Sequence, residues 1–444
     1  MKFSLKWTPL QILAGGYFLI TTLGAILLSL PVSTADRSGQ NFIDAFFLAT
    51  SAISTSGLSV VDIGSYYSTF GQIVVMTIFQ VGGLGYMTFF VFMISLFKKN
   101  MSIGNRVVAI ESVAGAGEIN LFKFFKIVLL ATFLFEFIGA AVLFFCWMGD
   151  FTPGRAVYQS AFHSISAFCT AGFSLFPDSL VRYRNSLPVN LTISLVSLAG
   201  GIGFIVLYDL GIFLRKAAAR KKPRRLASHS KMVLFATALV LGVSFAAILL
   251  TEPRLAPTGK GKVLAASFQA ISASTTDGYN TVDIGALGPS ALFVLLLLML
   301  IGAGPGSTGG GLKVSTLGVL VLSTWSFIRG KRDVNFQGRR IPEETITRAF
   351  YVLFLFIAIG ALDTFVLCTT EKSSFLQIIF EISSALGNTG LSTGITPTLT
   401  TAGKILITFT MFAGRVGPLT LGLSLLEKER NGRYHYADAN IYVG

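Results

Sequence analysis

Charged residues are scarce in this sequence of 444 residues. Asp, Glu, Lys and Arg together make up 13% of it, against about 25% in ordinary soluble domains. Hydrophobic residues make up 52%, and the mean hydropathy is +0.70. So few charges cannot cover the surface of a water-soluble domain of this size. The chain is therefore predicted to be an integral membrane protein.

Cysteine and histidine are also rare. The chain has three of each, at Cys146, Cys169, Cys368, His163, His229 and His435. The cysteines lie in or beside apolar runs, so they predict neither a disulfide framework nor a thiolate metal site. The histidines are scattered, and no H-E-x-x-H motif or Ser/His/Asp set is found. The sequence therefore predicts neither an enzyme nor an organic cofactor, and it directs attention to a transport pathway.

Long apolar runs are abundant. A helix that crosses a membrane needs about 20 apolar residues. Eight segments meet this requirement, at 8–30, 72–96, 127–148, 187–214, 232–250, 289–328 (interrupted), 348–368 and 402–426. An even number of spans returns the chain to the side on which it started.

The basic residues gather on one side of these spans. Of 35 Lys and Arg, 24 lie in the segments 1–6, 97–126, 215–231, 329–348 and 427–444. Because such an excess marks the cytoplasmic side, both termini of this multi-pass protein are predicted to lie inside the cell. The basic run at 215–225 lies between two spans. That position favours a topology signal in contact with membrane lipids over a nucleic-acid site.

A shorter motif recurs between the members of each pair of spans. Four half-apolar stretches, too short to cross a membrane, each end in a tetrapeptide that contains glycine. They are Phe42–Thr55, Ala156–Cys169, Val263–Thr275 and Phe375–Gly387, and their glycines are Gly57, Gly172, Gly278 and Gly390. The glycines recur at intervals of 115, 106 and 112 residues. This is an internal fourfold repeat.

A second glycine motif lies inside the apolar segment that follows each stretch. It reads Gly82-Gly83-Leu84-Gly85, Gly200-Gly201-Ile202-Gly203, Gly302-Ala303-Gly304 and Gly414-Arg415-Val416-Gly417. Small residues allow helices to approach closely in lipid. We therefore expect an all-α integral membrane protein of eight transmembrane helices and four re-entrant pore loops that enter from outside. Its four helix–pore-helix–helix repeats, at 1–100, 101–228, 229–335 and 336–444, would surround a pseudo-fourfold pore.

The glycine tetrapeptides are the candidate functional residues. Non-helical backbone at membrane depth is tolerated only where it is buried or lines a water-filled path. Glycine frees φ, so four converging strands would offer rings of carbonyl oxygens that replace the water around a cation. The predicted selectivity filter, with K⁺ as its ion, consists of Thr55, Ser56, Gly57, Thr170, Ala171, Gly172, Thr276, Asp277, Gly278, Asn388, Thr389 and Gly390.

Three acidic residues lie near this predicted filter. Asp277 precedes its glycine by one residue and would place a carboxylate at the filter. Asp62 and Asp283 follow their glycines by five residues, which suits either the outer mouth or helix caps in a solvated loop. The pore helices would aim their partially negative carboxyl ends at the cavity. Together these charges favour a cation.

The sixth apolar segment is interrupted by glycines and a proline at 302–312, a composition that no helix tolerates. It includes a formal G-x-G-x-x-G and a near match to a P-loop. No strand precedes it and Leu312 separates the last glycine from Lys313, so nucleotide binding is not predicted. The segment is either an intramembrane loop in the pathway or a fixed kink for helix packing.

The four filters, the broken sixth segment and the Gly-Arg-x-Gly motif of the eighth resemble those of the Trk/Ktr/HKT superfamily of potassium transporters. The resemblance covers essentially the whole chain and is strongest to the membrane subunits of bacterial Ktr systems. It implies K⁺ uptake, often dependent on Na⁺, across the bacterial plasma membrane. It also implies a homodimer on a cytosolic nucleotide-binding regulatory ring (KtrA-like). Because Gly57 is not the serine of the Na⁺-selective plant members, it favours K⁺ over Na⁺.

The resemblance also implies a gate. In the family the intramembrane loop obstructs the pore below the filter, and an arginine that matches Arg415 lies beside it. The gate residues predicted here are Gly302, Gly304, Gly306, Gly309, Gly310, Gly311, Lys313 and Arg415. The side chain of Lys313 is expected to extend to the cytoplasmic interface. For Glu136 and Asp363, within spans, hydrogen bonds between helices or a charge pair are expected in preference to an ion site.

Two rival functions remain at this point. An alternating-access cation symporter would also use broken helices, although that class has two large repeats in place of four small ones. An intramembrane enzyme would need a paired acid and base, or a nucleophile, facing a cavity. The sequence offers no such pair.

Overall fold

The structure, a computed structural model, describes residues 9–84, 121–219, 225–252, 255 and 259–417. Several predictions concern residues outside these ranges. They include Gly85, the inner ends of the second and eighth predicted spans, most of the basic segment 97–126, and the carboxyl-terminal tail.

The described helices form four units of three mutually contacting helices each. The first unit has α1 (Pro9–Ser29), α2 (Phe42–Ser54) and α4 (Thr69–Gly83), and the second has α7 (Leu121–Trp147), α8 (Pro153–Phe168) and α9 (Leu187–Gly201). The third has α11 (Ser228–Thr251), α12 (Gly259–Ser274) and α13 (Pro289–Leu300), and the fourth has α15 (Glu343–Thr370), α16 (Phe375–Gly387) and α17 (Thr401–Val416). Further helices are α3 (Ile63–Tyr66), α10 (Phe204–Ala218), α14 (Val314–Ile328) and four short 3-10 turns at Pro31–Ser33, Val181–Tyr183, Ile284–Ala286 and Thr396–Thr398.

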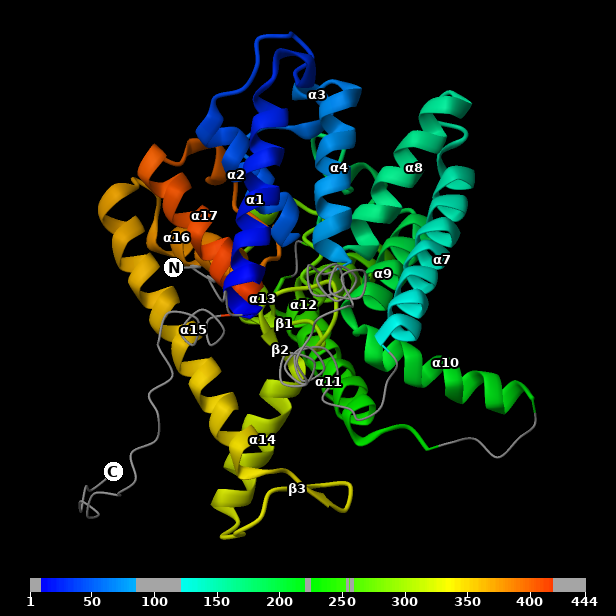
Figure 1. Ribbon diagram of the computed structural model, residues 1–444, viewed down its shortest axis with the longest axis vertical. Helices are drawn as coiled ribbons and strands as arrows, with labels where there is room; N and C mark the ends of the chain where they lie inside the picture. Colours follow the sequence, from blue (N-terminus) through cyan, green and yellow to red (C-terminus); the bar gives the residue numbers. More distant parts are fainter. Residues whose placement is uncertain (1–8, 85–120, 220–224, 253–254, 256–258, 418–444) are drawn as a thin grey trace, which may run out of the picture.

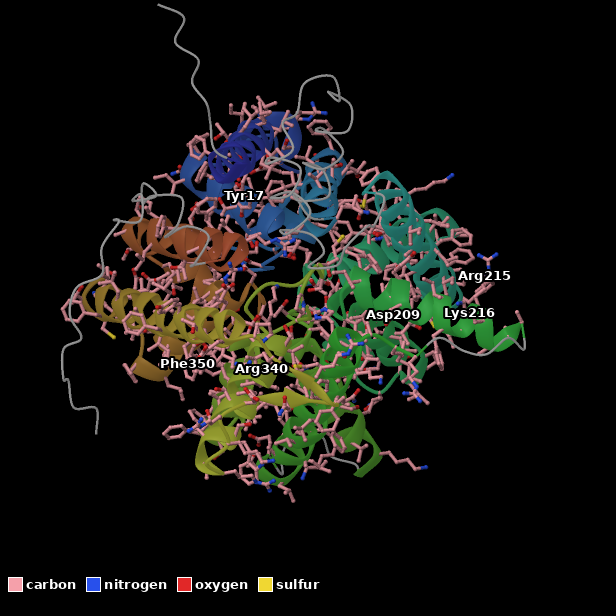
Figure 2. All side chains as sticks on the ribbon, turned by 60° about the horizontal axis from the view of Figure 1, so that its bottom comes forward. Tyr17, Asp209, Arg215, Lys216, Arg340 and Phe350 are labelled. Atoms are coloured by element: carbon pink, nitrogen blue, oxygen red, sulfur yellow. The ribbon has the colours of Figure 1, made fainter. Side chains whose placement is uncertain are left out.

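The four units close into a ring. The third helix of each unit contacts the middle helix of the next, as α4 does with α8, α9 with α12, and α13 with α16. The last of these contacts, between α17 and α2, joins the fourth unit back to the first. Figure 2 shows the same order, in which units coloured blue, teal, green to yellow and orange follow one another around a common centre. The middle helices therefore lie nearest the axis.

The ends of these helices follow local sequence signals. Asn41 caps α2 by accepting the amide of Ile43 at 3.0 Å, and Ser374 with Gln377 forms a capping box at the start of α16. A proline stands in the first turn of α8, α9 and α13, where its missing N–H costs no hydrogen bond. The predicted short stretches agree with the middle helices, except that α8 begins at Pro153 and α12 at Gly259, three and four residues before the predicted starts.

Three described helices are long and apolar enough to cross a membrane: Phe125–Trp147, Ser228–Thr251 and Glu343–Thr370. Only 28%, 22% and 17% of their most apolar stretches are buried within the protein. Such large exposed apolar surfaces mark contact with another apolar phase, which for helices of this length is the lipid bilayer. The structure thus has a helical fold with membrane-span candidates, and the full count of eight spans remains a prediction.

The predicted span 187–214 is not one continuous helix, because a bend divides it into two helices. α9 ends at Gly201, and α10 leaves it at an angle of 104° and runs across the other helices (Figure 1). Gly203, between them, has φ of 101°, a conformation that a residue with a side chain rarely adopts. The amide of Phe204 donates to the carbonyl of Gly306 at 3.0 Å, so contact with another segment stabilises the bend.

The purely helical prediction also misses two pairs of short strands. β1 (Ile301–Gly302) pairs in parallel with β2 (Leu312–Lys313), which closes the glycine-rich interruption into a loop. β3 (Asn335–Phe336) and β4 (Arg339–Arg340) form an antiparallel hairpin after α14. This hairpin lies within the segment 329–348, which is predicted to be cytoplasmic, and the last residues of α10 belong to the predicted cytoplasmic segment 215–231. The hairpin and α10 lie toward the same end of the molecule (Figure 1). Figure 2 labels Arg215 and Lys216 on α10 and Arg340 on the hairpin.

Candidate ion pathway

All four middle helices end in the same backbone pattern. A residue one or two positions beyond each helix end adopts the left-handed conformation, with φ of 54°, 49°, 56° and 52° at Thr55, Thr170, Thr276 and Asn388. Its amide donates to an alanine carbonyl three residues earlier, and the next amide donates to a serine carbonyl five residues earlier. Because the four turns are alike, the four short segments that follow them, here called strands, begin at equivalent places.

The glycine of each strand also has a positive φ, of 79°, 65°, 86° and 93° at Gly57, Gly172, Gly278 and Gly390. If a Cβ were added to any of these glycines, it would lie less than 3.0 Å from a carbonyl oxygen of the neighbouring strand. In each case that oxygen belongs to the residue just before the neighbouring strand's glycine. Those carbonyls belong to Ala171, Asp277, Thr389 and Ser56. The last contact, between Gly390 and Ser56, joins the fourth strand to the first. The four glycine backbones therefore meet in a closed ring that admits no side chain.

Thr308, in the loop between β1 and β2, lies directly against the left-handed residues. Its carbonyl accepts the hydroxyl of Thr55 at 3.2 Å, and its own hydroxyl is 3.1 Å from that of Thr170. The neighbouring amide of Gly310 donates to the hydroxyl of Thr276 at 3.1 Å, and Gly310 packs against Asn388. The fully buried Thr308 therefore contacts the ring of strands from below.

Hydrogen bonds also attach this loop to the break between α9 and α10. The amide of Gly304 donates to the carbonyl of Gly201 at 2.8 Å, and the amide of Thr308 donates to that of Gly200 at 3.2 Å. A side chain at Gly200 would collide with both Thr308 and the carbonyl of Phe168. Because Gly200 has no side chain, the end of α9 can pack closely against both α8 and the loop.

Two basic side chains contact the loop carbonyls. Arg415, near the end of α17, donates to the carbonyl of Thr308 and to that of Gly82 at the end of α4. Lys313 donates through Nζ to the carbonyls of Gly309 at 2.8 Å and Gly310 at 3.2 Å. The expected extension of Lys313 to the interface is therefore wrong, because the loop carbonyls offer its ammonium nearer acceptors.

Of the predicted gate residues, Gly302 lies in β1, and Gly304, Gly306, Gly309, Gly310 and Gly311 follow along the loop. Gly306 and Gly311 have positive φ, of 64° and 70°. Gly309 packs against Thr276, and Gly311 against Gly302. The structure thus brings the loop glycines together with Lys313 and Arg415 beneath the strands.

Asp277 does not direct its carboxylate at the ring, contrary to the expectation. Its side chain is 1% exposed and accepts a hydrogen bond from Ser197 of α9, so its backbone carbonyl faces Gly172 instead. The side chain of Asn388 bridges the first strand and α17. Its amide group donates to the hydroxyl of Ser56 at 2.7 Å and to the carbonyl of Met411 at 2.9 Å, which links the fourth strand to the first.

The other acidic residues have structural partners. Asp62 and Asp283 accept the amides of Gly64 and Gly285 at 3.3 and 2.9 Å, as the helix-cap alternative requires. The expected hydrogen bonds between helices are confirmed, since Gln80 donates to Glu136 at 2.8 Å and Thr410 donates to Asp363 at 2.7 Å. These four acids therefore stabilise turns and helix contacts.

Sequence reasoning missed Thr308 and the Ser-Ala pairs whose carbonyls accept the turn amides. The pairs begin at Ser51, Ser166, Ser272 and Ser384, each four residues before the left-handed Thr or Asn. The Ser-Ala dipeptide at a constant distance from the left-handed residue is a pattern that could have been found in the sequence. Thr308 has no such signal, because its contacts come from three other parts of the chain.

Comparison with known proteins identifies the class. A family model described as a cation transport protein, TrkH, matches residues 17–433. Because this match covers nearly the whole chain, the protein belongs to the TrkH family of membrane cation transport proteins. It is accordingly a transporter and not an enzyme.

Curated relatives are similar over almost their full lengths. The chain is 36% identical to Ktr system potassium uptake protein B of Bacillus subtilis, over 99% of this chain and 98% of the relative. It is 38% identical to the protein of the same name from Vibrio alginolyticus, over 91% and 88%. It is 33% identical to potassium/sodium uptake protein NtpJ of Enterococcus hirae, over 99% and 98%.

A solved structure shares the fold. The crystal structure of the potassium transporter TrkH from Vibrio parahaemolyticus superposes with a TM-score of 0.73 at 21% identity. The match covers 96% of this chain and 86% of that chain.

Proposed function

We propose that this protein carries K⁺ into the cell along the axis of the four units, with the four glycine strands as its selectivity filter. The observation that supports this most directly is the closed ring of glycines, each against a carbonyl of the next strand. Backbone carbonyls at membrane depth are the ligands that K⁺ filters use. Three curated relatives named for potassium uptake give independent support.

Sodium enters the proposal in a secondary role. One relative is named a potassium/sodium uptake protein, which supports Na⁺-dependent K⁺ uptake.

An alternating-access symporter, the second candidate, would turn over far more slowly than a pore. Single-protein flux in liposomes separates the two, because saturating, slow turnover with strict Na⁺ coupling would contradict a filter-and-gate mechanism.

The loop that holds Thr308 is the proposed gate. It lies against the strands from below, so in this position it obstructs the axis, and Arg415 adds positive charge there. The paired strands β1 and β2 close the base of the loop, directly between α13 and α14. A fixed kink predicts misfolding or unchanged flux when 304–309 is shortened, whereas a gate predicts folded protein with higher flux.

The proposed setting is the plasma membrane of a bacterium, with both termini in the cytoplasm. The end of α10, with Arg215 and Lys216, and the β3–β4 hairpin belong to predicted inner segments and supply basic surface at one end. A homodimer with a cytosolic nucleotide-binding ring is proposed from the family resemblance. The relatives named as parts of Ktr systems support a multicomponent assembly.

The filter assignment is tested with the full chain in liposomes, by ⁸⁶Rb⁺ uptake and its competition by K⁺ and Na⁺. Gly57→Ser should raise competition by Na⁺ about tenfold or abolish uptake, because the side chain would collide with the carbonyl of Ala171. Gly338→Ala is the matched control. Gly338 also has a positive φ, of 77°, but a Cβ there meets no atom within 4 Å. Unchanged ion competition in a folded Gly57→Ser protein would contradict the filter.

A further inference from the structure

The middle helices share a second equivalent position, three residues before each Ser-Ala pair. It is occupied by Leu48, His163, Gln269 and Glu381 in the four units. All four side chains are at most 5% exposed. Three of them are polar, which is costly in a buried place unless each polar atom has a partner. The hydrogen-bond partners of these three side chains indicate the role of this position.

Glu381 has the strongest set of contacts. Its carboxylate accepts the hydroxyl of Ser392 at 2.8 Å and also that of Thr396, two and six residues beyond Gly390. The two hydroxyls contact each other at 3.0 Å. The fully buried Glu381 therefore ties the chain that leaves the fourth strand to the helix that precedes it.

His163 does the same in the second unit. Its Nδ1 lies 2.8 Å from the carbonyl of Gln159 and must donate, since a carbonyl only accepts. Nε2 is then an acceptor for the hydroxyl of Ser174 at 3.1 Å and the amide of Leu175 at 3.4 Å. Both partners follow Gly172 by two or three residues.

The other two units have weaker contacts or none at this position. Gln269 reaches the hydroxyl of Thr281, three residues after Gly278, at 3.4 Å. Leu48 is apolar and packs among buried apolar residues of the first unit. In that unit Ser59, two residues after Gly57, bonds within its own loop to the carbonyl of Val61 at 2.5 Å. The restraint at this position is thus strongest in the fourth unit, weaker in the second, weaker still in the third and absent in the first.

We infer that Glu381, His163 and Gln269 are positioning residues, which hold the outer ends of three filter strands against their pore helices and leave the strand of Gly57 unrestrained at this position. This inference rests on the proposed filter. Carbonyl ligands discriminate between ions by where they are held, so loss of a tether should lower discrimination before it lowers stability. The size of the effect should follow the contacts, with Glu381 first, His163 second and Gln269 last.

The test uses the full chain in liposomes and competition of ⁸⁶Rb⁺ uptake by Na⁺. Glu381→Leu, which installs the residue of the first unit, should raise Na⁺ competition about tenfold, the equivalent of one buried hydrogen bond. Glu381→Gln keeps a carbonyl oxygen and two donors for the same hydroxyls, so it should retain selectivity near wild type. Gln269→Leu should change it least.

Two controls separate positioning from folding. Asp363→Leu removes a comparably buried carboxylate that bonds Thr410 between α15 and α17, and it should lower thermal stability without changing ion competition. If Glu381→Leu does not fold, the double variant Ser392→Ala, Thr396→Val can be used in its place. It removes the two hydroxyls that donate to Glu381 and keeps side chains of nearly the same shape. It should raise Na⁺ competition as Glu381→Leu does.

The outcomes are distinguishable from failure of the filter itself. If Gly57→Ser alters ion competition while folded Glu381→Leu and the double variant do not, the positioning role is wrong and the filter stands. Equal effects of Glu381→Leu and Glu381→Gln would also overturn the inference, because the hydrogen bonds would then not be the cause. If Gly57→Ser has no effect, the proposed filter is wrong, and the inference with it.

Discussion

Arg415 and Thr308, 107 residues apart, meet beneath the four strands, where the guanidinium donates to the threonine carbonyl. The same carbonyl accepts the hydroxyl of Thr55, and the same guanidinium also reaches the carbonyl of Gly82. One backbone oxygen of the loop is thus held by α17 and by the first strand together. Displacing the loop requires breaking both contacts at once.

Replacing Arg415 should therefore release the loop. In Arg415→Gln the side chain is shorter and uncharged, so it cannot bridge Thr308 and Gly82, and the barrier to cations falls as well. We expect K⁺ flux into liposomes to rise several-fold. Lys404→Gln is the matched control on the same helix, since Lys404 bonds Asp44 at the far end of α17. Flux equal to or below wild type in well-folded Arg415→Gln would argue against a gate.

Thr308→Val keeps the shape and the carbonyl but removes the hydroxyl that contacts Thr170. Loss of one buried hydrogen bond weakens the closed position by about 1 kcal/mol, so flux should rise about fivefold, less than in a variant without the loop. Thr316→Val, on α14 after the loop, is the control and should leave ⁸⁶Rb⁺ uptake unchanged. A similar rise in both variants would indicate a general loss of packing.

Gly278→Ala tests whether the strands act as one ring. The added methyl would collide with the carbonyl of Thr389, and φ of 86° disfavours any side chain. We expect Na⁺ competition to increase as it does in Gly57→Ser, although the two glycines lie in different units. Loss of selectivity in one variant alone would mean that the strands do not share one filter, and thermal unfolding in detergent would report any general damage.

The salt bridge between Lys404 and Asp44, at 2.6 Å, joins α17 to α2 and so helps to close the ring. Their side chains are 16% and 26% exposed, so the pair is only partly screened by solvent. Lys404→Met should lower the free energy of unfolding by about 0.5–1 kcal/mol at low salt, and by less at 1 M salt. Asp333→Asn, which removes the partner of the exposed Arg340, should have no measurable effect. If neither Lys404→Met nor a change of ionic strength alters the unfolding midpoint, the salt bridge does not contribute to stability.

The membrane class, the fourfold period and the middle helices could be predicted from the sequence because they depend on local properties. Scarce charge and long apolar runs require a bilayer, whatever the packing. Middle helices such as Phe375–Gly387 begin and end at residues whose own side chains or φ values set the boundary. The glycines at Gly57, Gly172, Gly278 and Gly390 identify the strands, since a strand that meets its neighbours there has no space for a side chain.

Only the tertiary structure decided where the polar side chains point and which segments meet. The carboxylate of Asp277 faces α9, and α10 bends away at Gly203, each because a partner distant in sequence provides a hydrogen bond. Lys313 turns back to the carbonyls of Gly309 and Gly310 in its own loop, whose ends are held together by the pairing of β1 with β2. The central place of Thr308 depends on contacts that exist only once the units have closed into a ring. Local sequence sets the conformation of each element, but the partner of a buried polar atom depends on the whole fold.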